Sequence, residues 1–369
     1  MIHLIRRLFA IVLFLNLLAS CTTDPVAGDF AAPKFGKVTV DTEAFRARIS
    51  CPVNGDLSGI SDYGIRFETP LKQGVSATLS NGMLQVEMKA LTPETDYRTE
   101  LYMSNGSETI TQPVSFRTEA GPEAVEIPDP VFRRYLLDHF DANEDDVLTV
   151  EEAVTIFRIE VNADSISSLK GIEKMTRLQE LIARGTESHG RLSKVDLSGN
   201  PLLRVCALDD NQISSIDLSG LPMLEEFGIG GNPLQEIDFS HNPRLGSIGM
   251  NNVPIDHLPD MSFLPLWSLH FDHVARFIDE NYLRNFPRMV GTNIGFYEGQ
   301  RIDLSRNTQL ISLWAYGCPH LEELDFTASD RFCELFVNDC PQLHTVKVRA
   351  GTVFAKLEKD AHTKIVYVE

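Results

Sequence analysis

The feature that most constrains this fold is a tripeptide, Asp-Leu-Ser or a close variant, that returns at a fixed interval in the second half of the chain. The intervals from one copy to the next are 21, 21, 22, 43, 22 and 22 residues, so the interval of 43 contains a repeat without the motif. A period of about 20 to 29 residues is typical of solenoids, in which each repeat forms one coil and stacks on its neighbours. The motif begins at Asp196, Asp217, Asp238, Asp260, Asp303 and Asp325, and Lys347 takes the same place once more.

Each repeat also carries the leucine-rich-repeat pattern L-x-x-L-x-L-x-x-N/C-x-L. One unit reads Leu203, Cys206, Leu208, Asn211 and Ile213. In such a solenoid the apolar columns stack in the core, and the Asn side chain binds backbone groups where the chain leaves the strand. The pattern predicts nine coils over residues 156–350, which start at Ile156, Leu178, Leu203, Leu224, Leu245, Leu266, Met289, Leu310 and Phe332.

Two cysteines, Cys318 and Cys340, occupy the Asn column on adjacent coils. We expect them to form a ladder of free thiols, and a disulfide between them is the alternative. The chain has six cysteines, too few and too scattered for a disulfide framework in an exported protein of 369 residues.

Residues 1–21 resemble an export signal. Arg6 and Arg7 precede an apolar run from Leu8 to Leu18, which is too short to span a bilayer as a helix. The sequence Leu18-Ala19-Ser20-Cys21 then resembles a bacterial lipobox, which implies that Cys21 receives lipid and becomes the first residue of the mature protein. An ordinary secretory signal is the alternative, and residues 22–34 are expected to be a tether.

Residues 35–118 alternate in period two, and Asn81-Gly82 and Asn105-Gly106 suit tight hairpins. This pattern predicts an antiparallel β-sandwich in which Cys51 is buried. The segment Leu91–Tyr97 resembles the tyrosine corner of fibronectin type III domains. The resemblance implies a hydrogen bond from Tyr97 to the backbone near Leu91.

A linker at 119–128 leads to a predicted helical cap at 129–155, with a helix from Asp129-Pro130 to about Phe140. The following loop resembles a calcium-binding EF-hand loop, in which oxygen ligands recur at alternate positions. The implied ligands of calcium are Asp141, Asn143, Asp145, the carbonyl of Val147, Thr149 and Glu152.

Two features of this loop favour a second interpretation. Asp146 stands where EF-hand loops have Gly, and a left-handed conformation there costs a residue with a side chain roughly 1 kcal/mol. Thr149 and Glu152 also form a capping box, the start of a helix that needs no metal. The calcium site and the metal-free helical cap therefore both remain open.

The net charge of −19 argues against nucleic acid as a partner, because the field repels phosphate groups. No nucleophile with a base, carboxylate pair or open metal site is evident, which indicates a protein that is not an enzyme. The nearest metal candidate is His270 with Asp272, which would need a third ligand to hold zinc.

The side chains that flank the strand leucines are expected to face the concave surface, the usual binding face of a solenoid. There the middle coils carry Gly228, Gly230 and Gly249, which predicts a flat surface, whereas the later coils are aromatic. Exposed aromatic side chains at such positions favour a binding site. The alternative is that residues 259–300, with a helical insertion at 273–286, cover the rings. The candidate ligand-binding residues are Trp267, His270, Trp314, Tyr316 and Phe336.

The order of signal, β-sandwich, acidic cap and solenoid, with residues 351–369 as a C-terminal cap, resembles the exported leucine-rich-repeat lipoproteins of Bacteroides-type bacteria. The resemblance implies an outer-membrane lipoprotein that is held to the membrane only by its lipid. It also implies that the protein binds a protein or glycan ligand at the cell surface. A structural spacer or assembly subunit of the envelope is the alternative.

Overall fold

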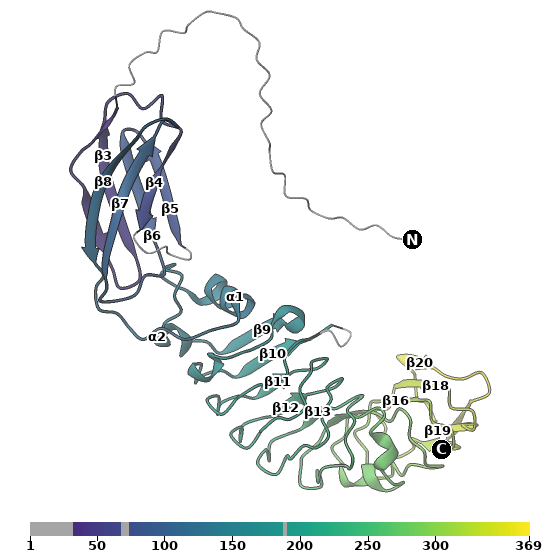
Figure 1. Ribbon diagram of the computed structural model, residues 1–369. Helices are drawn as coiled ribbons and strands as arrows, with labels where there is room; N and C mark the ends of the chain where they lie inside the picture. The colour runs from purple at the N-terminus through teal and green to yellow at the C-terminus, as the bar shows by residue number, and fades with distance from the viewer. Residues whose placement is uncertain (1–31, 68–73, 187–189) are drawn as a thin grey trace, which may run out of the picture. The chain divides into compact units, whose positions relative to one another are not determined.

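The computed structural model describes residues 32–67, 74–186 and 190–369, and these divide into two compact units. Of the described residues, the first unit comprises 32–41, 48–67, 74–87 and 97–116, and the second comprises 42–47, 88–96, 117–186 and 190–369. Figure 1 shows the strands of the first unit in purple and blue and the repeated strands of the second unit from teal to yellow. The predicted signal, with Cys21, lies outside the described residues.

The first unit is built from two sheets, in which the pairs β1–β3 and β4–β7 are antiparallel. One sheet has the order β1-β3-β6-β5, with β2 also paired to β3, and the other has the order β4-β7-β8. The strands are β1 (Lys34–Phe35), β2 (Thr39–Thr42), β3 (Ala47–Asn54), β4 (Asp62–Phe67), β5 (Val75–Ser80), β6 (Met83–Met88), β7 (Asp96–Ser104) and β8 (Thr109–Arg117).

Buried and exposed side chains alternate along the central strands of both sheets, as period two requires. On β3 the buried residues include Ile49 and Cys51, so the prediction that Cys51 is buried is confirmed. The ring of Tyr97 stacks on Phe116 with 5.3 Å between the centroids. Its hydrogen bond to the backbone near Leu91 stays a prediction.

The first helix of the second unit, α1 (Pro130–Phe140), lies at the position that the sequence predicts. The side chain of Asp129 accepts hydrogen bonds from the backbone of Val131 and Phe132, and Pro130 is the first helical residue, a position where no backbone N–H is needed. The helix buries Phe132, Leu136 and Leu137. A loop leads to the short helix α2 (Val150–Ala153). Among the described residues, no helix has the length and apolar character needed to cross a bilayer.

The remainder of the second unit is a leucine-rich-repeat-like β-solenoid, which confirms the main prediction. One strand from each coil joins a ten-stranded parallel sheet with the order β20-β18-β16-β15-β14-β13-β12-β11-β10-β9. The nine predicted coils supply nine of these strands, and β20 comes from residues 351–369. The strands are β9 (Arg158–Asn162), β10 (Glu180–Arg184), β11 (Val205–Ala207), β12 (Glu226–Gly228), β13 (Ser247–Gly249), β14 (Ser268–His270), β15 (Gly291–Asn293), β16 (Ser312–Tyr316), β18 (Glu334–Asn338) and β20 (Lys356–Glu358).

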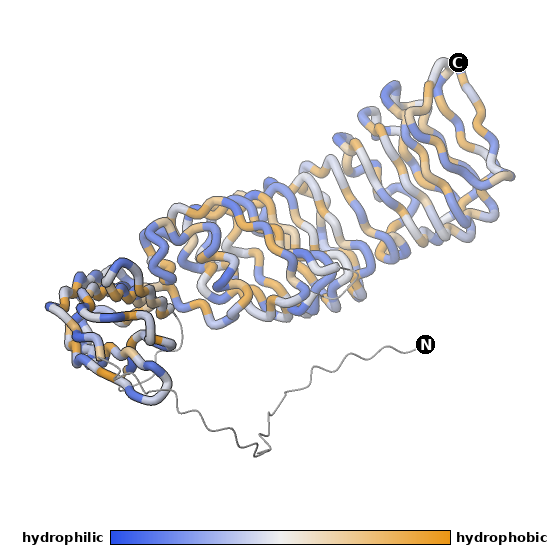
Figure 2. Tube along the Cα trace, turned by 90° about the horizontal axis from the view of Figure 1, so that it is seen from above, coloured by the Kyte–Doolittle hydropathy of each residue, from blue (hydrophilic) through white to orange (hydrophobic). Residues whose placement is uncertain are grey.

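Opposite the ten-stranded sheet, the coils return through turns, short 3₁₀ helices and a second parallel sheet. That sheet has the order β17-β19-β21. Apolar positions recur from coil to coil along the whole solenoid (Figure 2). The elements are η1 (Ala163–Ser165), η2 (Ile172–Lys174), η3 (Ala275–Phe277), η4 (Tyr282–Asn285), β17 (Glu323–Asp325), β19 (Thr345–Arg349) and β21 (Lys364–Val368).

The predicted helical insertion at 273–286 is wrong. This segment holds only the 3₁₀ helices η3 and η4, and β14 and β15 on either side pair with their neighbours like the strands of other coils. The reason is length, because Leu266 and Met289 are 23 residues apart, close to the ordinary period. The segment is a regular coil whose sequence departs from the pattern.

A single apolar core runs through the solenoid, and buried asparagines satisfy the backbone groups that the turns leave without partners. Asn232 Nδ2 donates to the carbonyls of Leu208, Ile229 and Gly230, and its Oδ1 accepts from Ile213 N. A second column arises from the Asn of Asp-Leu-Ser-x-Asn-Pro. Its members Asn200, Asn242 and Asn307 each donate to two carbonyls of the preceding coil.

The two cysteines of the Asn column replace part of that network. Cys318 Sγ donates to Ile294 O at 3.3 Å, and Cys340 Sγ donates to Ala315 O at 3.6 Å. Both are buried free thiols, as the ladder interpretation predicts.

Candidate binding surface

We use the term concave face for the solvent side of the ten-stranded sheet. Strand residues alternate between the core and this face, so each coil contributes one side chain to each exposed column. The parallel register aligns these side chains from strand to strand. The central exposed column reads Ile182, Ala207, Gly228, Gly249, His270, Asn293, Trp314 and Phe336, although its members Ala207 and Asn293 are themselves buried by their neighbours.

Trp314 and Phe336 form an aromatic pair in this column. They are register partners on β16 and β18, and their ring centroids are 4.6 Å apart. Trp314 is 46% exposed, whereas its strand neighbours Leu313 and Ala315 are buried. The sheet therefore holds a large apolar ring in solvent, with a second ring packed against it.

Tyr316 belongs to a second aromatic group, which lies at the end of the strands. Its ring is 5.3 Å from Phe296, and Phe296 is 3.9 Å from the ring of His273. Burial and a hydrogen bond with Asp272 raise the pKa of Tyr316. Sequence analysis missed Phe296, which follows β15 with a φ of 61°. It occupies the turn position that has a positive φ in each coil from Asp210 to Asp339, where the other coils carry Asp, Asn, Gly or His.

Trp267 lies apart from both groups. It directly precedes β14, two strands from Trp314 in the sheet, and its indole fills the space that Gly246 leaves open on the neighbouring coil. Trp267 is 42% exposed. The two tryptophans are thus exposed, and the expectation that residues 259–300 cover them is wrong. The structure does not gather the five candidate residues into one cluster.

The glycine-bearing coils form a hollow of about 240 Å³, where the sequence predicts a flat surface. Arg184, Asp209, Glu226, Asn251 and His270 are among its lining residues. The hollow exists because the positions of Gly228 and Gly249 lack side chains.

Asp209 is fixed at one side of this hollow. Its Oδ2 accepts from Arg184 Nε at 3.0 Å, and its Oδ1 accepts from Gly230 N at 2.9 Å. A Cβ at position 228 would stand 2.6 Å from Asp209 Oδ2, so a larger residue there would displace the carboxylate from this position. At Gly249 the nearest neighbours of a Cβ would be 3.8 Å away, which leaves room for a ligand.

His270 lies at the edge of the hollow. Desolvation by its surroundings lowers the pKa of the imidazole, and the carboxylate of Asp272 opposes this shift. The ring is therefore expected to be neutral at pH 7. Within the described ranges, no group of three or more His, Cys, Asp or Glu side chains is placed to hold a metal ion, so a third zinc ligand for His270 and Asp272 was not found.

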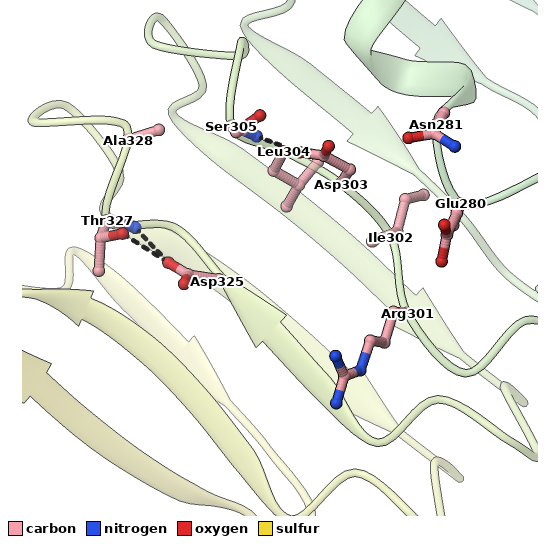
Figure 3. Close-up of a pocket in the computed structure, with 10 residues that line it drawn as sticks. All are labelled: Glu280, Asn281, Arg301, Ile302, Asp303, Leu304, Ser305, Asp325, Thr327 and Ala328. Atoms are coloured by element: carbon pink, nitrogen blue, oxygen red, sulfur yellow. Dashed lines mark hydrogen bonds between the residues drawn. The ribbon is translucent and has the colours of Figure 1, made fainter.

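A larger hollow of about 390 Å³ lies away from the ten-stranded sheet (Figure 3). Asp303 and Asp325, from successive copies of the repeat motif, line it. Each carboxylate accepts a hydrogen bond from the backbone two residues later, at Ser305 N and Thr327 N. These acids stabilise the turns of the solenoid, and the hollow is the space between two such turns.

The EF-hand-like loop between α1 and α2 is held by its own carboxylates. Asp141 accepts from the backbone of Asp145 and Asp146, and Asp145 Oδ1 accepts from Val147 N. Asp146 adopts a positive φ of 65°, the conformation that EF-hand loops assign to Gly at this position.

Thr149 and Glu152 form the predicted capping box. Thr149 Oγ1 accepts from Glu152 N, and Glu152 Oε2 accepts from Thr149 N at 2.9 Å. The other carboxylate oxygen of Glu152 accepts from Ala142 N. Glu152 thus joins the end of the loop to its beginning, and calcium binding stays a prediction.

Comparisons with known proteins give distant structural likenesses. The functional domain of InlJ from Listeria monocytogenes, which includes a cysteine ladder, is 17% identical with a TM-score of 0.32, and the match covers 67% of this chain and 70% of that chain. The internalin InlF of Listeria monocytogenes is 16% identical with a TM-score of 0.43, over 66% and 97% of the two chains. The leucine-rich repeat domain of APL1B is 17% identical with a TM-score of 0.26, over 66% and 84%. No protein-family model and no curated protein sequence matches the chain.

Proposed function

We propose that this protein is a non-catalytic binding module that recognises a protein ligand through the concave face of its solenoid. The observation that carries the proposal is the exposed pair of Trp314 and Phe336 on a rigid sheet that also bears a hollow. Aromatic side chains dominate the energetics of many interfaces, because they bury large apolar areas at little cost in conformational entropy.

The surroundings of the pair support a binding role over a purely structural one. A structural ring in a solenoid packs inward, as Phe227 and Phe271 do, whereas Trp314 faces solvent. The hollow over Gly228 and Gly249 adds polar groups on the same face of the sheet, with β13 three strands away from β16. Such a mixture of an apolar anchor and oriented polar groups is typical of recognition surfaces.

We further propose that the protein is displayed on the outer membrane by lipid at Cys21, with a fibronectin type III-like domain between the anchor and the solenoid. The lipobox resemblance supports the first part. The strand order of the two sheets, β1-β3-β6-β5 and β4-β7-β8, supports the second, because immunoglobulin-type sandwiches join their strands in this order. Replacing Cys21 with Ala should release the protein from the membrane fraction, and unchanged fractionation would contradict lipid anchoring.

A calcium ion in the loop from Asp141 to Glu152 is a separate proposal. The donor set fits the ion, because calcium prefers carboxylate, amide and carbonyl oxygens. Asp141, Asn143, Asp145 and Glu152 would hold it together with the carbonyl of Val147. Its contribution would be to neutralise the carboxylates and to stabilise the start of the solenoid.

The binding proposal is tested with the purified protein on peptide and glycan arrays. Trp314→Ala should abolish binding to the peptides that the wild-type protein selects. Phe263→Ala is the matched control, since Phe263 is also exposed but lies outside the ten-stranded sheet. Binding to sugars alone would change the ligand class, since an exposed indole also stacks on sugar rings. Absence of binding on both arrays would favour the alternative function, a structural spacer or assembly subunit of the envelope.

A further inference from the structure

We infer that the ligand of the concave face is a basic peptide segment, with one Lys or Arg side chain in the hollow over Gly228 and Gly249 and a second one over the Trp314–Phe336 pair. This inference rests on the proposed binding function and specifies the chemistry of the partner. It is carried by the charges on the sheet, by the polar groups of the hollow and by the distance between the two sites.

The exposed columns of the concave face carry an acid on four of the coils from β11 to β18, and two of these acids are paired with basic side chains of neighbouring strands. From β11 to β18 these columns contain no Lys or Arg within the described strands. Two basic groups are close to the hollow and both are paired: Arg184 on β10, which lines it, with Asp209, and Arg204, just before β11, with Glu225. A partner with positive charge is therefore attracted to this face, and one with negative charge is repelled. The acids in these columns are Asp209, Glu226, Asp272 and Glu334.

The hollow offers acceptors for a cationic side chain. Glu226 is exposed and makes no ion pair among the described residues. The cation that acts on it electrostatically, Arg204, is bound to Glu225, so the Glu226 carboxylate is available to a ligand. Asp209 lies on the adjacent strand with its position fixed by Arg184 and Gly230 N. His270 at the edge of the hollow has a lowered pKa and adds no positive charge at neutral pH. An ammonium or guanidinium group would find two carboxylates there.

The aromatic pair suits the same kind of side chain. A guanidinium or ammonium group above an indole ring gains a cation–π interaction, which is strongest for Trp. The methylene groups of Lys and Arg also pack on exposed rings. Trp314 is the one Trp in the central exposed column, and Phe336 beside it extends the apolar surface.

The separation of the two sites sets the spacing of the ligand. The strands β13 and β16 are three steps apart in the sheet, which corresponds to about 14 Å at about 4.8 Å per step. An extended peptide advances about 3.3 Å per residue, so about four residues connect the sites. The preferred ligand therefore has basic residues at positions i and i+4 and crosses the strands.

The test uses fluorescein-labelled Gly/Ser peptides of 12 residues with Arg at positions 4 and 8, and matched peptides with Gln, with Glu, or with Arg at positions 4 and 5. Fluorescence anisotropy with the full-length protein measures their affinities. The peptide with Arg at 4 and 8 should bind about tenfold more tightly than each of the others. Both Glu226→Gln and Trp314→Ala should lower the affinity for the peptide with Arg at 4 and 8 by about fivefold or more.

Glu236→Gln is the control, because it removes the same charge outside the ten-stranded sheet and should leave binding unchanged. Equal affinity for the Arg and Gln peptides, with binding lost in Trp314→Ala, would overturn the basic ligand and keep the proposed function. If neither Glu226→Gln nor Trp314→Ala changes the affinity for the Arg peptide, the peptide binds to another acidic surface, and the inference is overturned. No binding of any peptide would also overturn it, and the arrays would then decide the proposed function separately.

Discussion

Trp314 and Phe336 are register partners on adjacent parallel strands, and their rings lie 4.6 Å apart on the solvent side of the sheet. Their sequence neighbours Leu313 and Leu335 are also register partners on these two strands, and both are buried in the core. The two pairs share one backbone geometry and differ only in the face to which they point. The leucine side chains therefore support the fold, whereas the aromatic rings of Trp314 and Phe336 are free to bind a ligand.

The first prediction compares these two faces. Trp314→Ala should reduce the free energy of unfolding by only about 1 kcal/mol, the value of an exposed aromatic pair. Leu313→Ala should cost about 2–5 kcal/mol, because it opens a cavity in a close-packed core. Urea denaturation of both variants measures the difference, and a larger loss in Trp314→Ala than in Leu313→Ala would show that the indole has a structural role.

The second prediction concerns the asparagine column. Asn232→Ala takes the donor from the carbonyl of Ile229 and the acceptor from the N–H of Ile213, whereas the carbonyls of Leu208 and Gly230 still accept from Asn211 Nδ2 and Asp210 N. An unsatisfied buried polar group costs about 1–3 kcal/mol. We expect a loss of several kcal/mol in urea denaturation, more than in most point variants. Asn338→Ala is the control, because Asn338 is exposed at the end of β18. Equal effects of the two substitutions would contradict a backbone role of Asn232.

The solenoid could be predicted from the sequence because its constraints are local and repeated. Every coil must place an apolar side chain at the same positions, so the pattern survives even where single coils depart from it. The segment 273–286 was misjudged because unusual residues suggested an insertion, whereas the spacing of 23 residues leaves no room for one. In a solenoid, the number of residues between successive repeat positions therefore constrains the structure of a segment more strictly than its residue types do.

The candidate site could be predicted only in part, because the repeat pattern gives the column of a residue and not its contacts. Trp314 and Phe336 share a column on neighbouring coils and do meet, whereas Trp267 precedes its strand and joins no cluster. The hollow was missed because its volume depends on Asp209 folding over Gly228. Side-chain direction of this kind has no signature in a linear sequence.

The third prediction concerns the buried thiols. A hydrogen bond with Cys340 and burial raise the pKa of the Cys318 thiol, and burial raises that of Cys206. Because the thiolate is the reactive form, both should react slowly with iodoacetamide at pH 8 in the folded protein. Cys333 is half-buried and should react first. Mass spectrometry of labelled peptides reads the order, with unfolded protein as the control. A Cys318–Cys340 disulfide in the purified protein would contradict the free-thiol ladder.

The fourth prediction is the protonation of His270. Its pKa should lie below the ordinary value of about 6.5, since desolvation disfavours the imidazolium. A histidine whose pKa is lowered on folding contributes stability at pH values above its unfolded-state pKa, and this contribution is lost as the pH falls through the lower folded-state pKa. Asp272→Asn should lower the pKa further, because it removes the one charge that favours protonation. NMR titration of the ring protons tests both statements, and an increase in the variant would contradict this arrangement.

The fifth prediction uses Asp145 to separate the two interpretations of the acidic loop. Burial raises the pKa of its carboxyl, and Asp141 and Glu152 add to the effect. An acid whose pKa is raised in the folded state costs stability when it ionises, so the cost appears as the pH rises through the folded pKa. Without calcium at pH 7, Asp145→Asn should therefore melt at a higher temperature than the wild-type protein, and the difference should vanish in acid.

If the loop binds calcium, the ion reverses the order of the two melting temperatures, so that the wild-type protein melts above Asp145→Asn. The ion would pair with the Asp145 carboxylate and stabilise the wild-type protein by about 2.7 kcal/mol at a hundredfold excess over Kd, whereas Asp145→Asn would gain little. Melting curves in millimolar calcium and in chelator, recorded for both proteins, give the answer. Glu144→Gln is the control, because it removes a nearby charge that is not among the implied ligands. If calcium shifts neither melting curve, the loop is a metal-free helical cap, held by Thr149 and Glu152.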